Sequence, residues 1–290
     1  RMTGHAAWRS LVLIFLGIFL ISNWGKSTNW SFMNVLTQIG LGYTFLFLLW
    51  DRPRWVQAAA AAALLVGTWL LYVLWPGTGI NLATGNEAVG VSAAWAQENL
   101  KGVADAWHKN ANAGHAIDTW LLNLLPQQEP FVFNRGGYQT INCIPSLPTI
   151  IFGRMCGELL RTPLAGSRKL AILVAAGVAG IGLGLLLGAT GVFPFFKRIW
   201  TPSWALYSTG ICCLILASLY AVVDVAGFKA WTWPLMIVGV NSIAIYCMGQ
   251  LLKPWTARTL QTHFGEGVFT FAGPLWEPTV KACLVGLCFW

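Results

Sequence analysis

Polar side chains interrupt otherwise apolar stretches at several positions of this 290-residue chain. Asn142 and Ser146 lie one helical turn apart beside Pro145, and Asn241 and Ser242 lie inside VGVNSIAIYCMGQLL. An amide or hydroxyl inside a bilayer is costly unless it faces a partner, the bundle interior or a cavity. We therefore treat these four residues as candidates for lining a site. A hydrogen bond between helices is the alternative for each.

Charged residues mark further candidate positions. Arg9 lies at the mouth of the first apolar stretch, where it either anchors the helix to the cytoplasmic face or binds a phosphate with its forked guanidinium. Asp224 ends the stretch AVVDVAG, where the helix dipole disfavours a carboxylate, so either a cap or a site must hold it. Arg154 and Glu158 are spaced i, i+4 and are expected to neutralise each other.

Metal chemistry is not expected. His108 and His115 each lie three residues from an aspartate, Asp105 or Asp118, but no third ligand of suitable spacing accompanies them. The seven cysteines lie in or beside apolar runs without a CxxC pair, which is typical of small buried hydrophobic residues. No GxSxG, Walker or HExxH motif occurs in the sequence.

The composition identifies the elements that must position these residues. The chain is 56% hydrophobic and 10% charged, whereas about a quarter of the residues of a soluble domain are charged. Its net charge of +8 comes from bases that lie between apolar stretches, so they are expected to set membrane orientation, and nucleic acid is not expected as a partner. Apolar runs of about 20 residues predict an all-α, polytopic transmembrane helix bundle.

We expect seven full spans and a truncated eighth, grouped as 1–76, 77–140 and 141–290. The spans are 9–23, 32–50, 55–76, 141–160, 169–192, 203–224, 231–252 and 279–290. Bases in the short loops favour a cytoplasmic N-terminus, eight against five, which makes the polar segment 77–140 extracytoplasmic. Val91, Trp95, Val103 and Trp107 fall on one stripe there and predict an amphipathic helix.

Two further patterns concern packing and the chain ends. Ala176, Gly180, Gly184 and Gly188 recur every four residues, which predicts close approach of a second helix. The sequence opens at Arg1 without an initiator Met and closes inside an apolar stretch, so we expect further sequence beyond both ends.

Several stretches resemble one known family, the heparan-α-glucosaminide N-acetyltransferase family of multi-pass acyltransferases and its bacterial relatives. The resemblance is carried by AWRSLVLIFLGIFLISN (7–23), NVLTQIGLGY (34–43), GGYQTINCIPSLPTIIFGRMCGELLR (136–161), FPFFKRIWTPSWALYS (193–208), LYAVVDVAGF (219–228) and VNSIAIY (240–246). Their order holds along nearly all of the chain outside 77–135. Each motif is weak alone, and the ordered set is fairly specific.

The resemblance implies an integral membrane enzyme of a bacterial plasma membrane. It would move an acetyl group from acetyl-CoA to an amino sugar or glycan across the membrane. The essential histidine of the family is implied to lie upstream of Arg1, so residues 1–290 alone are expected to be inactive and the catalytic residue is unknown within them. Positions that match family motifs are Arg9, Lys197, Trp200, Asp224, Asn241 and Ser242, whereas Asn142 and Ser146 are expected to line the passage.

Two departures from the family pattern leave the acceptor open. The VLQR-type motif reads Val35-Leu36-Thr37-Gln38, and the DPEG-like start of the fourth span reads Tyr138-Gln139-Thr140-Ile141-Asn142. The implied partners are the lipid bilayer, an amino sugar or glycan acceptor and a second copy of the chain in a homodimer. Two other functions remain open: a secondary transporter of a small polar or anionic solute, and a structural membrane protein whose polar groups only join helices.

Overall fold

The computed structural model describes residues 2–23 and 25–290, and these are predominantly helical, which confirms the all-α class. The chain divides into two compact units, residues up to 221 and residues 222–290, which are described separately. The helices of the first unit are α1 Met2–Ser22, α2 Val35–Leu48, α3 Arg54–Leu74, α4 Ala93–Asn99, α5 Ala113–Leu122, α6 Cys143–Arg161, α7 Gly166–Ala189 and α8 Pro202–Tyr220. A two-stranded antiparallel ribbon joins β1 (Gly85–Asn86) to β2 (Val91–Ser92).

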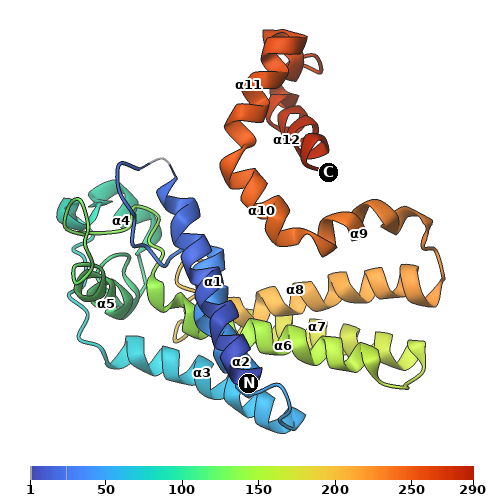
Figure 1. Ribbon diagram of the computed structural model, residues 1–290. Helices are drawn as coiled ribbons and strands as arrows, with labels where there is room; N and C mark the ends of the chain where they lie inside the picture. Colours follow the sequence, from blue (N-terminus) through green and yellow to red (C-terminus); the bar gives the residue numbers. More distant parts are fainter. Residues whose placement is uncertain (1, 24) are drawn as a thin grey trace. The chain divides into compact units, whose positions relative to one another are not determined.

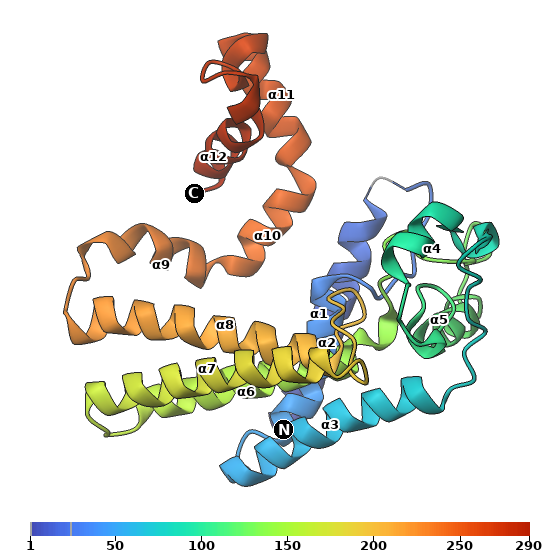
Figure 2. The ribbon, with the colours of Figure 1, turned by 180° about the vertical axis from the view of Figure 1, so that it is seen from behind.

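The long helices of the first unit pack in pairs. α1 packs on α2, α3 packs on α6, and α7 packs on α8, while α6 also contacts α2 and α8 (Figures 1 and 2). α6 therefore links the α1–α2 pair, α3 and the α7–α8 pair, so that residues along α6 can meet several elements at once.

The α7–α8 contact follows the predicted seam of small residues. A Cβ atom built on Gly180 would lie 3.0 Å from the Cα of Gly210, and one built on Gly184 would lie 2.7 Å from the carbonyl oxygen of Ser203. Both distances are shorter than a normal contact, so only glycine lets the two backbones come this close.

Seven full spans are not confirmed. Among the described residues, four helices are long and apolar enough to cross a bilayer, namely α1, α3, α7 and α8 with its extension to Val225. The predicted span 32–50 yields only the 14-residue α2, because Asn34 caps the helix by accepting a hydrogen bond from the main-chain N–H of Thr37 (3.0 Å). The predicted span 141–160 becomes α6, whose 19 residues include Arg154, Glu158 and Arg161.

The polar segment 77–140 folds onto the end of α3. The ring of Tyr72 stacks on that of Trp107 with centroids 4.8 Å apart, and its hydroxyl donates to Gln139 Oε1. Gln139 in turn donates to Asn112 Oδ1 over 2.6 Å. The expected single amphipathic helix does not form, because Val91 lies in β2, Trp95 in α4, and Val103 and Trp107 beyond the end of α4.

The boundary between the units falls inside a π-helical turn, Ala221–Val225. The second unit continues through α9 Trp233–Val240, α10 Ser242–Leu251, α11 Lys253–Phe264 and α12 Glu277–Phe289. The predicted span 231–252 is bent by 68° where α9 meets α10 at Asn241, so it forms a broken span or a re-entrant loop. Ala257, Phe269 and Val285 form the core of α11 and α12. The sequence did not predict α11, which carries Lys253 and Arg258 and lacks a long apolar run.

Candidate functional site

The predicted residue Lys197 lines a pocket where the polar segment meets the loop between α7 and α8. The pocket has a volume of about 290 Å³. Its aromatic wall includes Trp95 and Trp107, and Lys109 and Arg198 join Lys197 at its edge. Asn112, which is buried, lies at the end of the hydrogen-bonded chain from Tyr72 described above.

The pocket carries an excess of positive charge. Lys109, Lys197 and Arg198 line it, and the described residues contribute no carboxylate to its lining. The Lys109 ammonium lies 4.9 Å from the centroid of the Trp95 ring, a cation–π contact. Burial and the nearby Arg198 charge both lower the pKa of Lys109. An anionic ligand would relieve this accumulation of like charges.

α6 positions the loop that carries Lys197 and Arg198. The side chain of Asn142, only 2% exposed at the start of α6, donates through Nδ2 to the Arg198 carbonyl oxygen over 2.7 Å. Arg198 Nη1 donates to the Gly136 carbonyl oxygen, also over 2.7 Å. Two turns further along α6, Thr149 Oγ1 accepts a 3.2 Å hydrogen bond from Trp200 Nε1. These bonds fix the loop against the helix.

Trp200 itself has an unusual backbone. Its φ is +50°, a left-handed conformation that is uncommon for a large side chain. The main-chain N–H of Trp200 donates to the Lys197 carbonyl oxygen over 3.2 Å, which closes a turn around residues 197–200. Strained residues of this kind persist where the surrounding structure holds them and are frequent at functional sites.

The structure brings four of the predicted site residues into one region of the first unit. Lys197 lines the pocket, and Asn142 and Trp200 brace its loop from behind. Ser146 lies one turn further along α6 and donates to the Cys143 carbonyl oxygen of its own helix (3.2 Å). Arg9 is exposed on α1 and does not line this pocket.

The remaining predicted residues belong to the second unit, where all three are exposed. Asp224 lies in the π-helical turn, and Asn241 and Ser242 lie at the bend between α9 and α10. Asn241 Nδ2 donates to the Ile237 carbonyl oxygen over 3.0 Å, so this amide satisfies a main-chain group next to the break in the helix.

His108 and Asp118 of the polar segment have structural partners. His108 accepts the Ile80 N–H at Nδ1 (3.0 Å) and contacts the Val103 carbonyl oxygen through Nε2 (3.0 Å), so both ring nitrogens are engaged. Asp118, 1% exposed, accepts the Thr140 N–H at 3.1 Å, and burial raises the pKa of this carboxyl to about 6. Within residues 2–23 and 25–290, no group of three metal-ligating side chains comes together.

Sequence reasoning missed Lys109, Asn112 and Arg198. Arg198 lies inside the quoted stretch 193–208, directly after Lys197, but was not among the residues selected from it, and Lys109 and Asn112 lie in the polar segment outside any motif. They become site residues only when 95–112 and 195–199, far apart in the chain, meet at one pocket. Aromatic faces beside cations and amides are suited to a polar ligand with an anionic group, and Trp faces also stack on sugar rings.

The four long apolar helices indicate an integral membrane protein of the all-α class. No family model matches the chain. The chain is similar to human heparan-alpha-glucosaminide N-acetyltransferase, with 25% identity over 306 aligned positions that cover 91% of this chain and 45% of the human protein. The chain thus spans about half the length of this curated relative. The similarity supports a distant relationship to an N-acetyltransferase.

Proposed function

We propose that this protein is a transmembrane acetyltransferase that moves an acetyl group from acetyl-CoA to an amino sugar or glycan. The observation that carries the proposal is the distant similarity, which extends over 91% of the chain to a protein named for N-acetyl transfer to a glucosaminide. In such a reaction the thioester C–S bond breaks, an amide C–N bond forms, the amine loses a proton and the thiolate gains one.

The cationic pocket supports this proposal and has a role in it. Lys109, Lys197 and Arg198 would attract an anionic substrate, and the partly exposed Trp95 would pack on its ring, whereas Trp107 is buried against Tyr72 and only closes the wall of the pocket. In the orientation expected from the positive-inside count, the pocket belongs to the extracytoplasmic polar segment, where a glycan would arrive. We therefore assign the pocket to the acceptor.

The other predicted residues receive narrower roles in the proposal. Asn142 and Trp200 are positioning residues that hold the 193–201 loop, and Ser146 lies behind that loop. Arg9 at the opposite mouth of α1 would bind a phosphate of the acyl donor. Asp224, and Asn241 and Ser242 beside the helix break, are exposed in the second unit, and a binding role for them stays a prediction from the resemblance.

The test is acetyl transfer by the full-length protein in lipid nanodiscs, with radiolabelled acetyl-CoA and oligosaccharides that carry free amines. Lys109→Gln and Lys197→Gln should raise KM for an anionic acceptor about tenfold, the effect expected for loss of one charged hydrogen bond. Lys101→Gln is the matched control, because Lys101 is exposed in the same polar segment and lies outside the pocket. Failure to bind acetyl-CoA or to acetylate any amine would refute the proposal.

A secondary transporter remains the competing function because one span is broken at Asn241. Transporters with discontinuous helices usually carry a broken segment in each of two repeats. The described residues contain one such bent pair. Uptake of a sugar or anion into vesicles without acetyl-CoA would favour the transporter.

A further inference from the structure

A second cavity lies at the other end of α6 from the cationic pocket. It has a volume of about 570 Å³ and lies between the C-terminal end of α2 and the last three turns of α6. Leu46 and Ile150 contribute apolar wall, and Trp50 contributes an aromatic face. Its charged lining consists of Asp51, Arg154, Glu158 and Arg161.

Arg154 is the unusual member of this lining. Its side chain is 9% exposed, and its guanidinium lies 4.8 Å from the centroid of the Trp50 ring. Nη2 contacts Glu158 Oε1 at 2.8 Å, which confirms the predicted i, i+4 pair. Nε and Nη1 are buried and have no hydrogen-bond partner. The pair therefore accounts for only part of what this guanidinium can donate.

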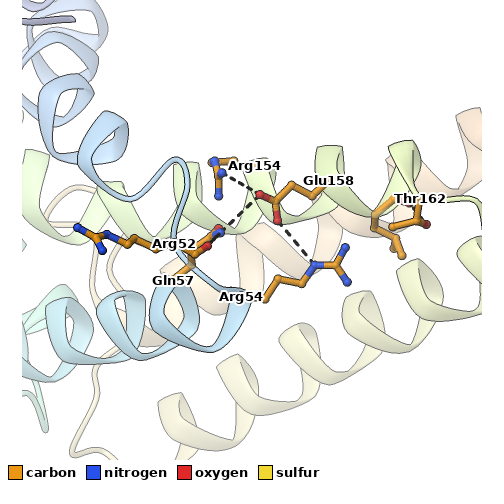
Figure 3. Close-up of polar contacts among 7 residues, drawn as sticks. Arg52, Arg54, Gln57, Arg154, Glu158 and Thr162 are labelled. Atoms are coloured by element: carbon orange, nitrogen blue, oxygen red, sulfur yellow. Dashed lines mark hydrogen bonds and ion pairs between the residues drawn. The ribbon is translucent and has the colours of Figure 1, made fainter. Parts of the chain in front are cut away.

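Glu158 contacts residues of α3 as well as Arg154. Its Oε2 lies 3.7 Å from Arg54 Nε, and its Oε1 lies 3.5 Å from Gln57 Nε2, both on α3 (Figure 3). One carboxylate thus faces two guanidinium groups and an amide. A buried polar N–H without an acceptor destabilises the protein, so an anion that satisfied Arg154 would be bound favourably.

The surroundings indicate what kind of anion would fit. Trp50 and Trp55, together with Arg52 and Arg54, flank the α2–α3 turn, and tryptophans and bases are typical of the membrane–water interface. The cavity pairs this polar end with the aliphatic wall of Leu46 and Ile150. Asp51 and Glu158 balance the charges of Arg154 and Arg161 in the lining, so a ligand held only by net positive charge would not bind here.

We propose that this cavity binds a phosphate ester with an apolar or aromatic moiety attached, with Arg154 donating its free N–H groups to the phosphate and Arg161 facing it from the next turns of α6. Two sources carry this chemistry: the headgroup of an anionic phospholipid, and a soluble phosphate ester such as coenzyme A. The site does not depend on acetyl transfer, and binding can be measured without turnover.

The experiment measures thermal unfolding of the full-length protein in nanodiscs of phosphatidylcholine, with either phosphatidylglycerol in the bilayer or coenzyme A in the buffer. We expect one of these phosphates to raise the unfolding temperature, and the one whose effect depends on Arg154 identifies the source, because a shift with coenzyme A that Arg154→Met leaves unchanged belongs to the donor site proposed at Arg9. Arg154→Met should weaken the apparent affinity about tenfold or more. Arg168→Met is the control, because Arg168 is exposed and lies outside the cavity.

A second variant separates binding from a purely structural ion pair. Glu158→Gln removes a competing carboxylate from Arg154 and should strengthen phosphate binding. If the ion pair serves only to hold α6 against α3, both variants would lower the unfolding temperature without changing its dependence on phosphate. That result, or the absence of any shift with either phosphate in the unaltered protein, would overturn the proposal.

Discussion

Replacement of Gly184 by alanine tests whether close backbone contact holds α7 to α8. The new Cβ atom would lie 2.7 Å from the Ser203 carbonyl oxygen and 2.8 Å from the main-chain nitrogen of Tyr207. Backbone atoms cannot turn away as a flexible side chain can, so the two helices must separate locally. Overpacking of this kind costs typically about 1–3 kcal/mol.

The same helix supplies a matched control. A Cβ on Gly182 meets nothing within 4 Å, so Gly182→Ala changes helix propensity without changing contact between the helices. Gly to Ala in a helix interior gains up to about 1 kcal/mol from propensity. Gly184→Ala gains the same propensity term but also incurs the overpacking cost. The difference between the two variants should therefore be about 1–3 kcal/mol, with Gly184→Ala the less stable.

The assay is unfolding of the purified protein from mixed micelles by increasing sodium dodecyl sulfate, followed by circular dichroism and tryptophan fluorescence. Fluorescence reports the packing, because Trp204 on α8 contacts the rings of Phe195 and Tyr207 near the seam. If Gly184→Ala were as stable as Gly182→Ala, the α7–α8 interface would not depend on glycine contact. The assignment of the seam would then be wrong.

Three further predictions concern single side chains. Because burial raises the pKa of Asp118 to about 6, the folded state binds the carboxyl proton more tightly than the unfolded state. The stability that this proton contributes, roughly 3 kcal/mol, is lost as the pH rises from about 4 to about 6. Asp118→Asn should abolish this pH dependence, measured by thermal unfolding. Asn142→Leu removes the hydrogen-bond donor to the Arg198 carbonyl oxygen, so the loop is held less firmly and KM for the acceptor should rise. Asn142→Gln keeps an amide donor and should bring KM partly back toward its original value. Arg9→Ala should weaken the affinity for coenzyme A without lowering the unfolding temperature, because Arg9 is exposed. An equal loss of affinity and of thermal stability would contradict the role of Arg9 in binding the acyl donor.

Hydropathy predicted the helices that are long and apolar along their whole length. The apolar runs 9–23, 55–76, 169–192 and 203–224 correspond to α1, α3, α7 and α8, because length and apolarity alone decide whether a helix can cross a bilayer. Hydropathy did not predict the 68° bend at Asn241 inside 231–252, where two helices together are long and apolar enough to cross a bilayer. It also could not find α11, whose packing on Phe269 and the α12 residue Val285 is a tertiary contact.

The candidate site was predictable only in part, for a related reason. Lys197 and Trp200 were found because a motif contains them, and Asn142 was found because an amide stands out in an apolar context. The sequence did not predict the contact that joins α6 to this loop, the hydrogen bond from Asn142 to the carbonyl oxygen of Arg198, which lies 56 positions away. Lys109 has no such local marker and joins the site only because the polar segment folds back onto α3.

Asn142 at the start of α6 and Arg154 further along it each carry buried polar atoms without a hydrogen-bond partner. Asn142 Nδ2 donates to the Arg198 carbonyl oxygen, but Asn142 Oδ1 is buried without a hydrogen-bond partner. Near its end, Arg154 has two donor atoms in the same condition. Asn142 braces the loop from behind and does not line the cationic pocket, so its free acceptor is not offered to a ligand there. Arg154 does line a cavity, and its free donors predict an anion beside them. If phosphate stabilised the protein equally in Arg154→Met and in the unaltered chain, these free donors would have no role in binding.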